Sequence, residues 1–222
     1  MRDRLQIGAL CWVLTGQFFL AQFLAQAAFP DYSLVRYDIS LLGATSCGFF
    51  PEPSSGATGE LCSPRHAVFN LGLVLHGLLS ILGAWFTRAY WPGGREASLG
   101  LACLAVGGAG AVLAGAFPFN VAITPHIIGA VMALGLPGVG LILLARVLWV
   151  RHPVFARFTV LTGTTILLGA IGHALGGGPF GRGTVERLAA WPQTIWYMAT
   201  GVLLAAGYLQ EGRRKLVLGH FT

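Results

Sequence analysis

Five side chains of this protein have the right types and positions to do chemistry, because each stands where an apolar stretch meets a polar loop. They are His66, His126 and His173, together with Asp38 and Glu186. A carboxyl group shielded from water can exchange protons with a substrate, since burial moves its pKa towards neutrality. The candidate catalytic residues are therefore Asp38, Glu186 and His126, with a carboxyl as the acid and a histidine as the base.

Imidazoles and carboxylates are also the side chains that bind zinc. The sequence contains no HExxH or HxxxH pair, which would supply two ligands from one helix, so we assign no metal ligand. A b-type haem held by two histidines is another alternative, and it would use two of His66, His76, His126 and His173. His76 can equally be a hydrogen-bonded core histidine, a proton relay or a cavity-lining residue. The sequence therefore does not identify a cofactor.

Polar residues near these groups are candidates for binding a ligand. Four arginines on the same side of the predicted membrane suit an anionic group such as a phosphate, namely Arg36, Arg65, Arg182 and Arg187. The candidate ligand-binding residues are Tyr32, Arg36, His66, Asn70, Asn120, His173, Arg187 and Gln193. The glycine-rich stretch 176–183 follows no strand, so it does not have the context of a nucleotide-binding loop.

Long apolar helices must position these residues. The chain has 222 residues, of which 55% are hydrophobic and 10% are charged, against about 25% charged in soluble domains. Six uncharged runs have about the length that crosses a bilayer, at about 6–29, 66–90, 97–117, 124–145, 158–175 and 189–210. No stretch alternates as β-barrel strands do. We predict one all-α domain over residues 1–222, a polytopic bundle of six transmembrane helices.

The distribution of charge predicts the orientation. Ten cations and three anions fall on the side of the two termini, and four cations and five anions fall on the other side. By the positive-inside rule, both termini are cytoplasmic and the protein is a multi-pass protein of the cell membrane. The pI of about 9.6 then reflects topology, and a nucleic-acid partner is not needed to explain it.

The largest loop on the predicted outer side covers residues 30–64. Residues 31–43, which we call the roof segment, mix polar and apolar side chains at helical spacing and predict a short helix that lies at the interface or dips back. Residues 51–56 indicate a plain loop. Cys47 and Cys62 flank it on an oxidising side, which favours a disulfide. Cys11 and Cys103 lie in apolar spans and should pack as small hydrophobes.

Several short motifs carry a resemblance to a known family. They are Asp31-Tyr32-Ser33, Ile39-Ser40-Leu41-Leu42-Gly43, His66-Ala67-Val68-Phe69-Asn70, Phe117-Pro118 with His126 soon after, and Gly183-Thr184-Val185-Glu186-Arg187. The chain resembles the prokaryotic membrane family called domain of unknown function 998. This resemblance implies a six-helix membrane domain with its distinctive residues on the outer side, and it implies no activity. Residues 45–61 depart from the pattern as an insertion. Membrane hydrolases of the alkaline ceramidase type have a paired-histidine motif and a seventh span, which this chain lacks.

Together these observations predict an outward-facing polar pocket covered by the roof segment. We expect it to bind an amphipathic molecule, lipid or isoprenoid-like, with the polar end at His66, His126, Arg36 and Glu186 and the tail between helices. The alternatives are an enzyme acting on such a molecule and a b-type haem protein. Membrane lipid is the other expected partner, and the oligomeric state is left open. A transporter is less favoured, because no charged residue stands at mid-membrane.

Overall fold

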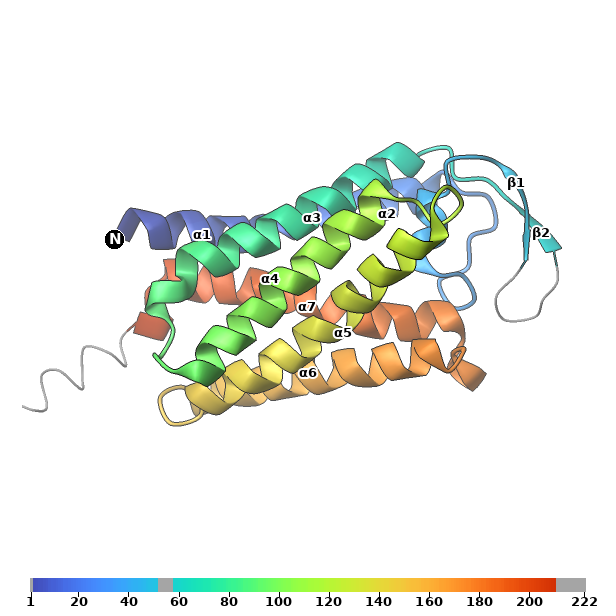
Figure 1. The fold of residues 1–222 in the computed structure, drawn as a ribbon. Helices are drawn as coiled ribbons and strands as arrows, with labels where there is room; N and C mark the ends of the chain where they lie inside the picture. Colours follow the sequence, from blue (N-terminus) through green and yellow to red (C-terminus); the bar gives the residue numbers. More distant parts are fainter. Residues whose placement is uncertain (1, 52–57, 211–222) are drawn as a thin grey trace, which may run out of the picture.

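The apolar stretches form antiparallel helices that run the length of the molecule (Figure 1). The structure is a computed structural model, and it describes residues 2–51 and 58–210. The long helices are α1 (Arg2–Leu14), α2 (Gln17–Ala27), α3 (His66–Thr87), α4 (Arg95–Ala116), α5 (Ile123–Leu148), α6 (Pro153–Ala174) and α7 (Arg182–Ala205). Four short 3-10 helices join them in the described ranges, η1 (Ile39–Gly43), η2 (Arg88–Tyr90), η3 (Gly178–Phe180) and η4 (Tyr208–Gln210).

The helices follow one another around the bundle, and α7 closes it by packing against α1. Figure 1 shows the N-terminus and the end of α7 at one end of the bundle, which we call the terminal end, and the loop after α2 at the other, the roof end. Within the described ranges, five segments have the length and hydropathy to cross a membrane. The prediction of a helical membrane protein is confirmed. The count of six spans and the cytoplasmic termini stay predictions.

The sixth predicted span, 189–210, corresponds to α7, which starts earlier, at Arg182, and ends at Ala205. Its first two turns carry Arg182, Glu186 and Arg187. The first predicted span, 6–29, is divided into α1 and α2. Thr15 bonds back through its hydroxyl to the Trp12 carbonyl, at 2.6 Å, and such side-chain bonds to the backbone compete with regular helix.

Close contacts between glycines hold α3, α4 and α5 together, as is common between membrane helices. A Cβ on Gly77 of α3 would lie 2.3 Å from the carbonyl oxygen of Gly108 on α4. A Cβ on Gly110 would lie 2.5 Å from the carbonyl oxygen of Gly129 on α5. Gly135 of α5 differs from these glycines, because a Cβ there would have no neighbour within 4 Å.

The core has two parts. At the terminal end, a cluster of aromatic rings surrounds Trp12, which contacts Trp91, Trp196 and Tyr197 at centroid distances of 5.6–6.0 Å. At the roof end, Phe18, Phe69 and Leu42 belong to a second cluster of buried residues. Leu42 is part of η1, so a loop residue completes the core at this end.

The loop before α3 contains an antiparallel hairpin that the sequence does not predict, β1 (Gly48–Pro51) and β2 (Thr58–Leu61), with Gly48 opposite Leu61. This hairpin is an exception to the predicted all-α fold class. Pro51, predicted as loop, ends β1, and the rest of the predicted loop lies outside the described residues. The roof segment is helical only at Ile39–Gly43, as a 3-10 helix, and it dips into the bundle.

A disulfide joins Cys47 and Cys62 at the open ends of the two strands, as predicted. Cys11 and Cys103 are free. We expect denatured, unreduced protein to react with a maleimide at two thiols and reduced protein at four. Mass spectrometry of the labelled protein measures this. Replacing Cys62 by Ser should add Cys47 to the thiols labelled without reductant, and unchanged labelling would contradict the disulfide.

Candidate functional site

The roof segment closes the roof end of the bundle by burying its apolar side chains among α2, α3 and α7. Leu42 is fully buried, and η1 contacts all three helices. Two side chains hold its backbone from the α3 side. Ser63 donates a hydrogen bond to the Leu42 carbonyl at 2.6 Å, and Asn70 donates one to the Gly43 carbonyl at 3.0 Å. The buried carbonyls at the end of η1 are therefore satisfied.

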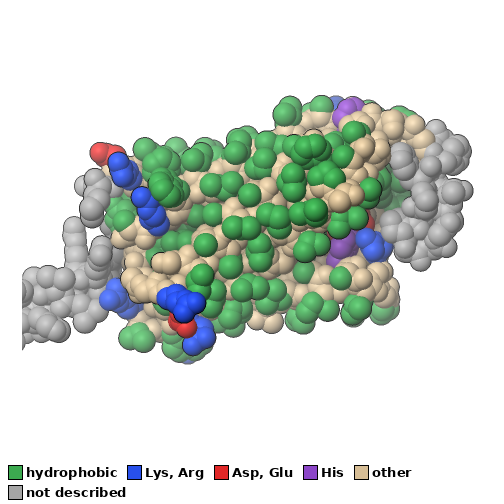
Figure 2. Space-filling model, in the orientation of Figure 1, with side chains coloured by type: hydrophobic (Ala, Val, Ile, Leu, Met, Phe, Trp, Pro, Cys, Tyr) green, Lys and Arg blue, Asp and Glu red, His purple; other side chains and the backbone are tan. Residues whose placement is uncertain are grey.

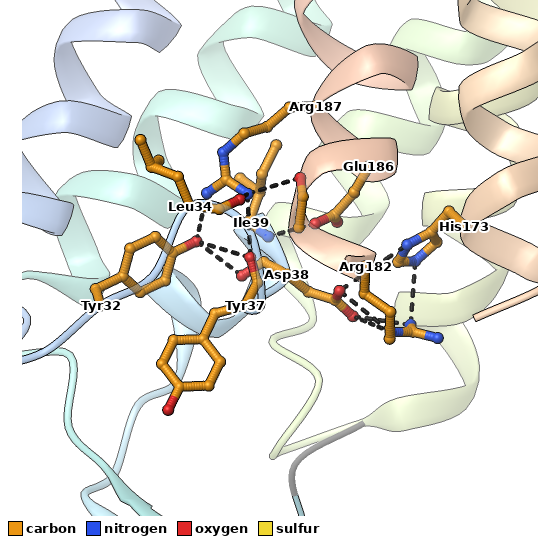
Figure 3. A network of polar contacts seen from close by, with 10 residues as sticks. Tyr32, Leu34, Tyr37, Asp38, Ile39, His173, Arg182, Glu186 and Arg187 are labelled. Carbon is orange, nitrogen blue, oxygen red and sulfur yellow. Dashed lines mark hydrogen bonds and ion pairs between the residues drawn. The ribbon is translucent and has the colours of Figure 1, made fainter. Parts of the chain in front are cut away.

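Arg187 holds the other side of the roof segment from α7 (Figure 3). Its side chain is buried, with 6% of the residue exposed. One terminal nitrogen lies 2.8, 3.0 and 2.8 Å from the carbonyl oxygens of Leu34, Tyr37 and Gly183, so its two N–H groups are shared among three acceptors. The other terminal nitrogen donates to the Tyr32 hydroxyl at 2.7 Å. A single guanidinium thus fixes three points of the roof segment against the first turn of α7.

Gly183 makes this approach of the two backbones feasible. A Cβ at this position would lie 2.3 Å from the Tyr37 carbonyl oxygen and 2.5 Å from that of Leu34. These are the same two carbonyls that accept hydrogen bonds from Arg187. Any side chain at Gly183 would push the roof segment away from α7 and from the guanidinium.

Tyr32 relays the contact from Arg187 to the residue before η1. Its hydroxyl accepts a hydrogen bond from Arg187 and donates one to the Asp38 carbonyl at 2.9 Å. Burial raises the pKa of the Tyr32 hydroxyl well above its usual value, although the nearby Arg187 charge opposes this rise. The hydroxyl therefore keeps the proton that it donates.

Asp38 forms an ion pair with Arg182, the first residue of α7 (Figure 3). Arg182 Nε lies 3.2 Å from both carboxylate oxygens, and one terminal nitrogen lies 2.8 Å from Oδ2. His173, at the end of α6, completes the group with Nδ1 3.9 Å from the Asp38 carboxylate and Nε2 3.2 Å from Arg182. Both carboxylate oxygens of Asp38 are thus engaged by one arginine.

Glu186 and His126 line one cavity of about 60 Å³ directly beneath η1. Glu186 comes from α7 and His126 from the first turn of α5, and both residues are buried. Ser40 of η1 also lines the cavity, and most of the remaining wall is apolar, including Phe18, Phe69, Leu73, Ala133, Leu134 and Ala190. Two of the three candidate catalytic residues therefore share one small, largely apolar cavity.

The hydrogen bonds of these two side chains define what each offers. The Glu186 carboxyl accepts the backbone N–H of Ile39. His126 Nδ1 lies 3.1 Å from the Ala114 carbonyl oxygen and 3.0 Å from that of Phe117. Carbonyls only accept, so Nδ1 carries a proton, and in the neutral imidazole Nε2 is then an acceptor. The imidazole of His126 and the carboxyl of Glu186 thus line the same cavity.

Four of the other candidate ligand-binding residues contact other parts of the protein and do not line the cavity. Asn120 accepts the N–H of Thr45 and donates to the hydroxyls of Thr45 and Ser46. Gln193 donates to the Ala133 carbonyl at 3.2 Å, and His66 Nδ1 lies 3.0 Å from the Ser63 carbonyl oxygen. Arg36 is exposed, and its guanidinium lies over the Tyr37 ring.

The structure therefore brings together Tyr32, Asp38, His173, Glu186 and Arg187, and it leaves His66, Asn120 and Arg36 outside this group. Arg182 and Gly183 also belong to this group, and neither is among the candidate catalytic or ligand-binding residues, although Arg182 is one of the four arginines considered for an anionic group. A signal for Arg182 is present in the sequence, because Arg182 and Glu186 stand one helical turn apart and Arg187 follows directly.

The four histidines considered for haem have separate neighbours. His76 is buried against the rings of Phe18 and Tyr197, whereas His66, His126 and His173 make the contacts described above. Within residues 2–51 and 58–210, no three His, Cys, Asp or Glu side chains are grouped so that they could hold a metal ion.

Comparison with known proteins gives one match. A family model described as "Protein of unknown function (DUF998)" matches residues 13–203. This range includes the roof segment, the cavity and every residue of the polar network in Figure 3. No curated protein and no solved structure matches the chain.

Proposed function

The chain belongs to the family DUF998, and we propose that this integral membrane protein binds one end of an amphipathic molecule, lipid or isoprenoid-like, in the cavity beneath the roof segment. One observation carries the proposal. A buried carboxyl, an imidazole acceptor and a serine converge on a cavity whose other walls are mostly apolar. Ligand sites combine apolar walls with a few placed polar groups in this way.

The size of the cavity limits what enters it. Its volume of about 60 Å³ compares with about 10–15 Å³ for one water molecule on the same measure, so an end group of a few non-hydrogen atoms fits and a whole headgroup does not. A hydroxyl or amine matches the site best, because His126 Nε2 accepts a hydrogen bond. The polar end of the ligand is therefore placed at Glu186 and His126, whereas His66 and Arg36, included in the expectation from sequence, do not line the cavity.

By the charge distribution, the roof end faces outward. A ligand from the outer leaflet would then reach the cavity after the roof segment moves. The hydrogen bonds of Arg187 and the Asp38–Arg182 ion pair join that segment to α7. We assign these groups to holding the cover closed, with Glu186 and His126 in contact with the ligand.

An enzyme acting on the same molecule is the second candidate. It is favoured by the presence of a carboxyl and an imidazole on one cavity, which is the pair that proton transfer requires. Asp38, the third candidate catalytic residue, is taken up by its ion pair with Arg182. Chemical conversion of the bound molecule on prolonged incubation, abolished in Glu186→Gln and His126→Gln, would favour this candidate over simple binding.

Filling the cavity is expected to expel the ligand. Replacing Ala133 by leucine adds an isopropyl group to the buried wall, and we expect the amount of co-purified molecule to fall at least about tenfold. Ala109→Leu makes the same change on the exposed face of α4 and should retain the molecule. Mass spectrometry of solvent extracts from the purified proteins measures both.

Equal retention in the Ala133→Leu and Ala109→Leu proteins would contradict the proposal. Size-exclusion elution of both variants checks that they fold. Glu186→Gln preserves the volume of the side chain and changes only its carboxyl, so it provides the test if Ala133→Leu does not fold. Unchanged ligand retention in Glu186→Gln would then contradict the contact with Glu186.

A further inference from the structure

A second, larger depression lies at the opposite end of the bundle. It is a groove of about 420 Å³ between the end of α3, the turn after it and the start of α4. Ile81, Ala84 and Trp85 form its α3 wall, and Ala97, Leu101 and Ala105 form its α4 wall. We propose that this groove binds an anionic phospholipid of the surrounding leaflet, with an acyl chain along the apolar walls and the phosphate at Arg88.

The packing of α3 and α4 explains why the groove exists. The two helices approach most closely where a Cβ on Gly77 would meet the Gly108 backbone. Beyond this contact, the turn after α3 inserts Trp91 into the aromatic core, where its ring lies 6.0 Å from those of Trp12 and Trp196. The turn separates the two helices, and the small side chains of Ala84 and Ala97 leave the space between them unfilled.

The groove faces the surroundings of the bundle. Trp85, on its rim, is 59% exposed, and Ala102, in the α4 wall, is also exposed. A volume of about 420 Å³ falls in the range of about 300–1,000 Å³ that holds small-molecule ligands. An apolar groove open to the bilayer accommodates an acyl chain, and an exposed tryptophan is typical of the depth where chains meet headgroups.

Arg88 places positive charge at the end of the groove. Its guanidinium carbon lies 3.6 Å from the centroid of the Trp85 ring, and one terminal nitrogen donates to the Trp85 carbonyl at 3.0 Å. These contacts use one of its N–H groups and fix the direction of the side chain. The remaining N–H groups suit a phosphate, which arginine binds with paired hydrogen bonds.

The surroundings of Arg88 favour an anionic occupant over a zwitterionic one. Six arginines whose side chains the structure describes stand in or beside the helix ends at the terminal end, Arg4, Arg88, Arg95, Arg146, Arg151 and Arg157, against Asp3 and Glu96. Figure 2 shows Lys and Arg side chains gathered at this end of the molecule. Glu96 is paired with Arg146 at 3.1 Å. The residue before α4 is Gly94, which has no side chain to accept hydrogen bonds from the first N–H groups of the helix. These N–H groups lie beside Gly93 and Ser98, which line the groove, and they add to the positive electrostatic potential there.

The test compares two lipids that differ only in headgroup. Delipidated protein in detergent is titrated with palmitoyl-oleoyl phosphatidylglycerol or phosphatidylcholine, and native mass spectrometry measures the bound fraction. We expect phosphatidylglycerol to bind more tightly. Arg88→Ala should weaken its binding about fivefold, which is the effect of one arginine near an anionic surface, and should leave phosphatidylcholine binding unchanged. Arg151→Ala, an exposed arginine outside the groove, is the control.

A second pair of variants tests the groove itself. Ala102→Trp fills it and should abolish the bound lipid, whereas Ala109→Trp changes an exposed α4 position outside it. Equal affinity for the two lipids would overturn the proposal, as would equal losses in Arg88→Ala and Arg151→Ala, or lipid retention in Ala102→Trp. None of these residues belongs to the roof segment or its cavity, so this outcome is independent of the proposed function.

Discussion

Replacement of Arg187 by methionine is expected to lower the free energy of unfolding by about 3–5 kcal/mol, the range for breaking a buried charged network. Methionine is nearly as long and apolar, so it preserves most of the volume. The carbonyls of Leu34, Tyr37 and Gly183 and the Tyr32 hydroxyl all lose a donor, at a contact that is buried for Gly183 and part-buried for the other three. Each unsatisfied buried group has its own desolvation cost.

Thermal unfolding in detergent, followed by differential scanning fluorimetry, measures this effect. A protein of this size loses about 2–4 °C of Tm per kcal/mol, so we expect a fall of at least about 6 °C. The matched control is Arg36→Met, an exposed arginine in the roof segment itself, which should change stability by less than about 0.5 kcal/mol. Similar Tm values for the two variants would contradict the role that we assign to Arg187.

Replacement of Gly77 by alanine is expected to destabilise the protein by about 1–3 kcal/mol, the usual cost of overpacking. The new Cβ would lie 2.3 Å from the Gly108 carbonyl oxygen and 2.8 Å from the backbone nitrogen of Val112. Both atoms belong to the backbone of α4, so no side-chain rotation relieves the clash. The two helices must separate, and they lose contacts along their length.

Gly135→Ala is the control for this substitution, since it adds the same methyl group inside α5 where nothing lies within 4 Å. Alanine favours helix over glycine by about 1 kcal/mol, so this variant should be unchanged or slightly more stable. Gly77→Ala is thus expected to lower the Tm, whereas Gly135→Ala is expected to leave the Tm unchanged or raise it slightly. A stabilised Gly77→Ala protein would show that α3 and α4 are farther apart than the structure places them.

The polar residues at the roof end divide into two groups with different tasks. Arg187, Tyr32, Asp38 and Arg182 bond mainly to one another and to roof-segment backbone, and they fasten that segment to α7. Glu186 and His126 line the cavity. A group of ionisable residues at one depth is therefore not in itself a binding site, because most of these residues form hydrogen bonds and ion pairs with one another.

The sequence by itself determined that this is a helical membrane protein, through the length and composition of its apolar runs. Runs of about 20 uncharged residues leave the backbone no partner except its own helix in a bilayer, so the long helices follow from composition. The disulfide between Cys47 and Cys62 was also predictable, because both cysteines flank one loop on the side predicted to face an oxidising compartment.

Only the tertiary structure decided which polar residues work together. Glu186 is adjacent to Arg187 in the chain, yet its carboxyl lines the cavity with His126, 60 positions away, while Arg187 bonds to the roof segment. The register of α7 against a loop from the other end of the chain sets this division, and it depends on Gly183 letting the two backbones touch. Helix periodicity places residues on a face, but which neighbour covers that face is settled by packing between distant segments.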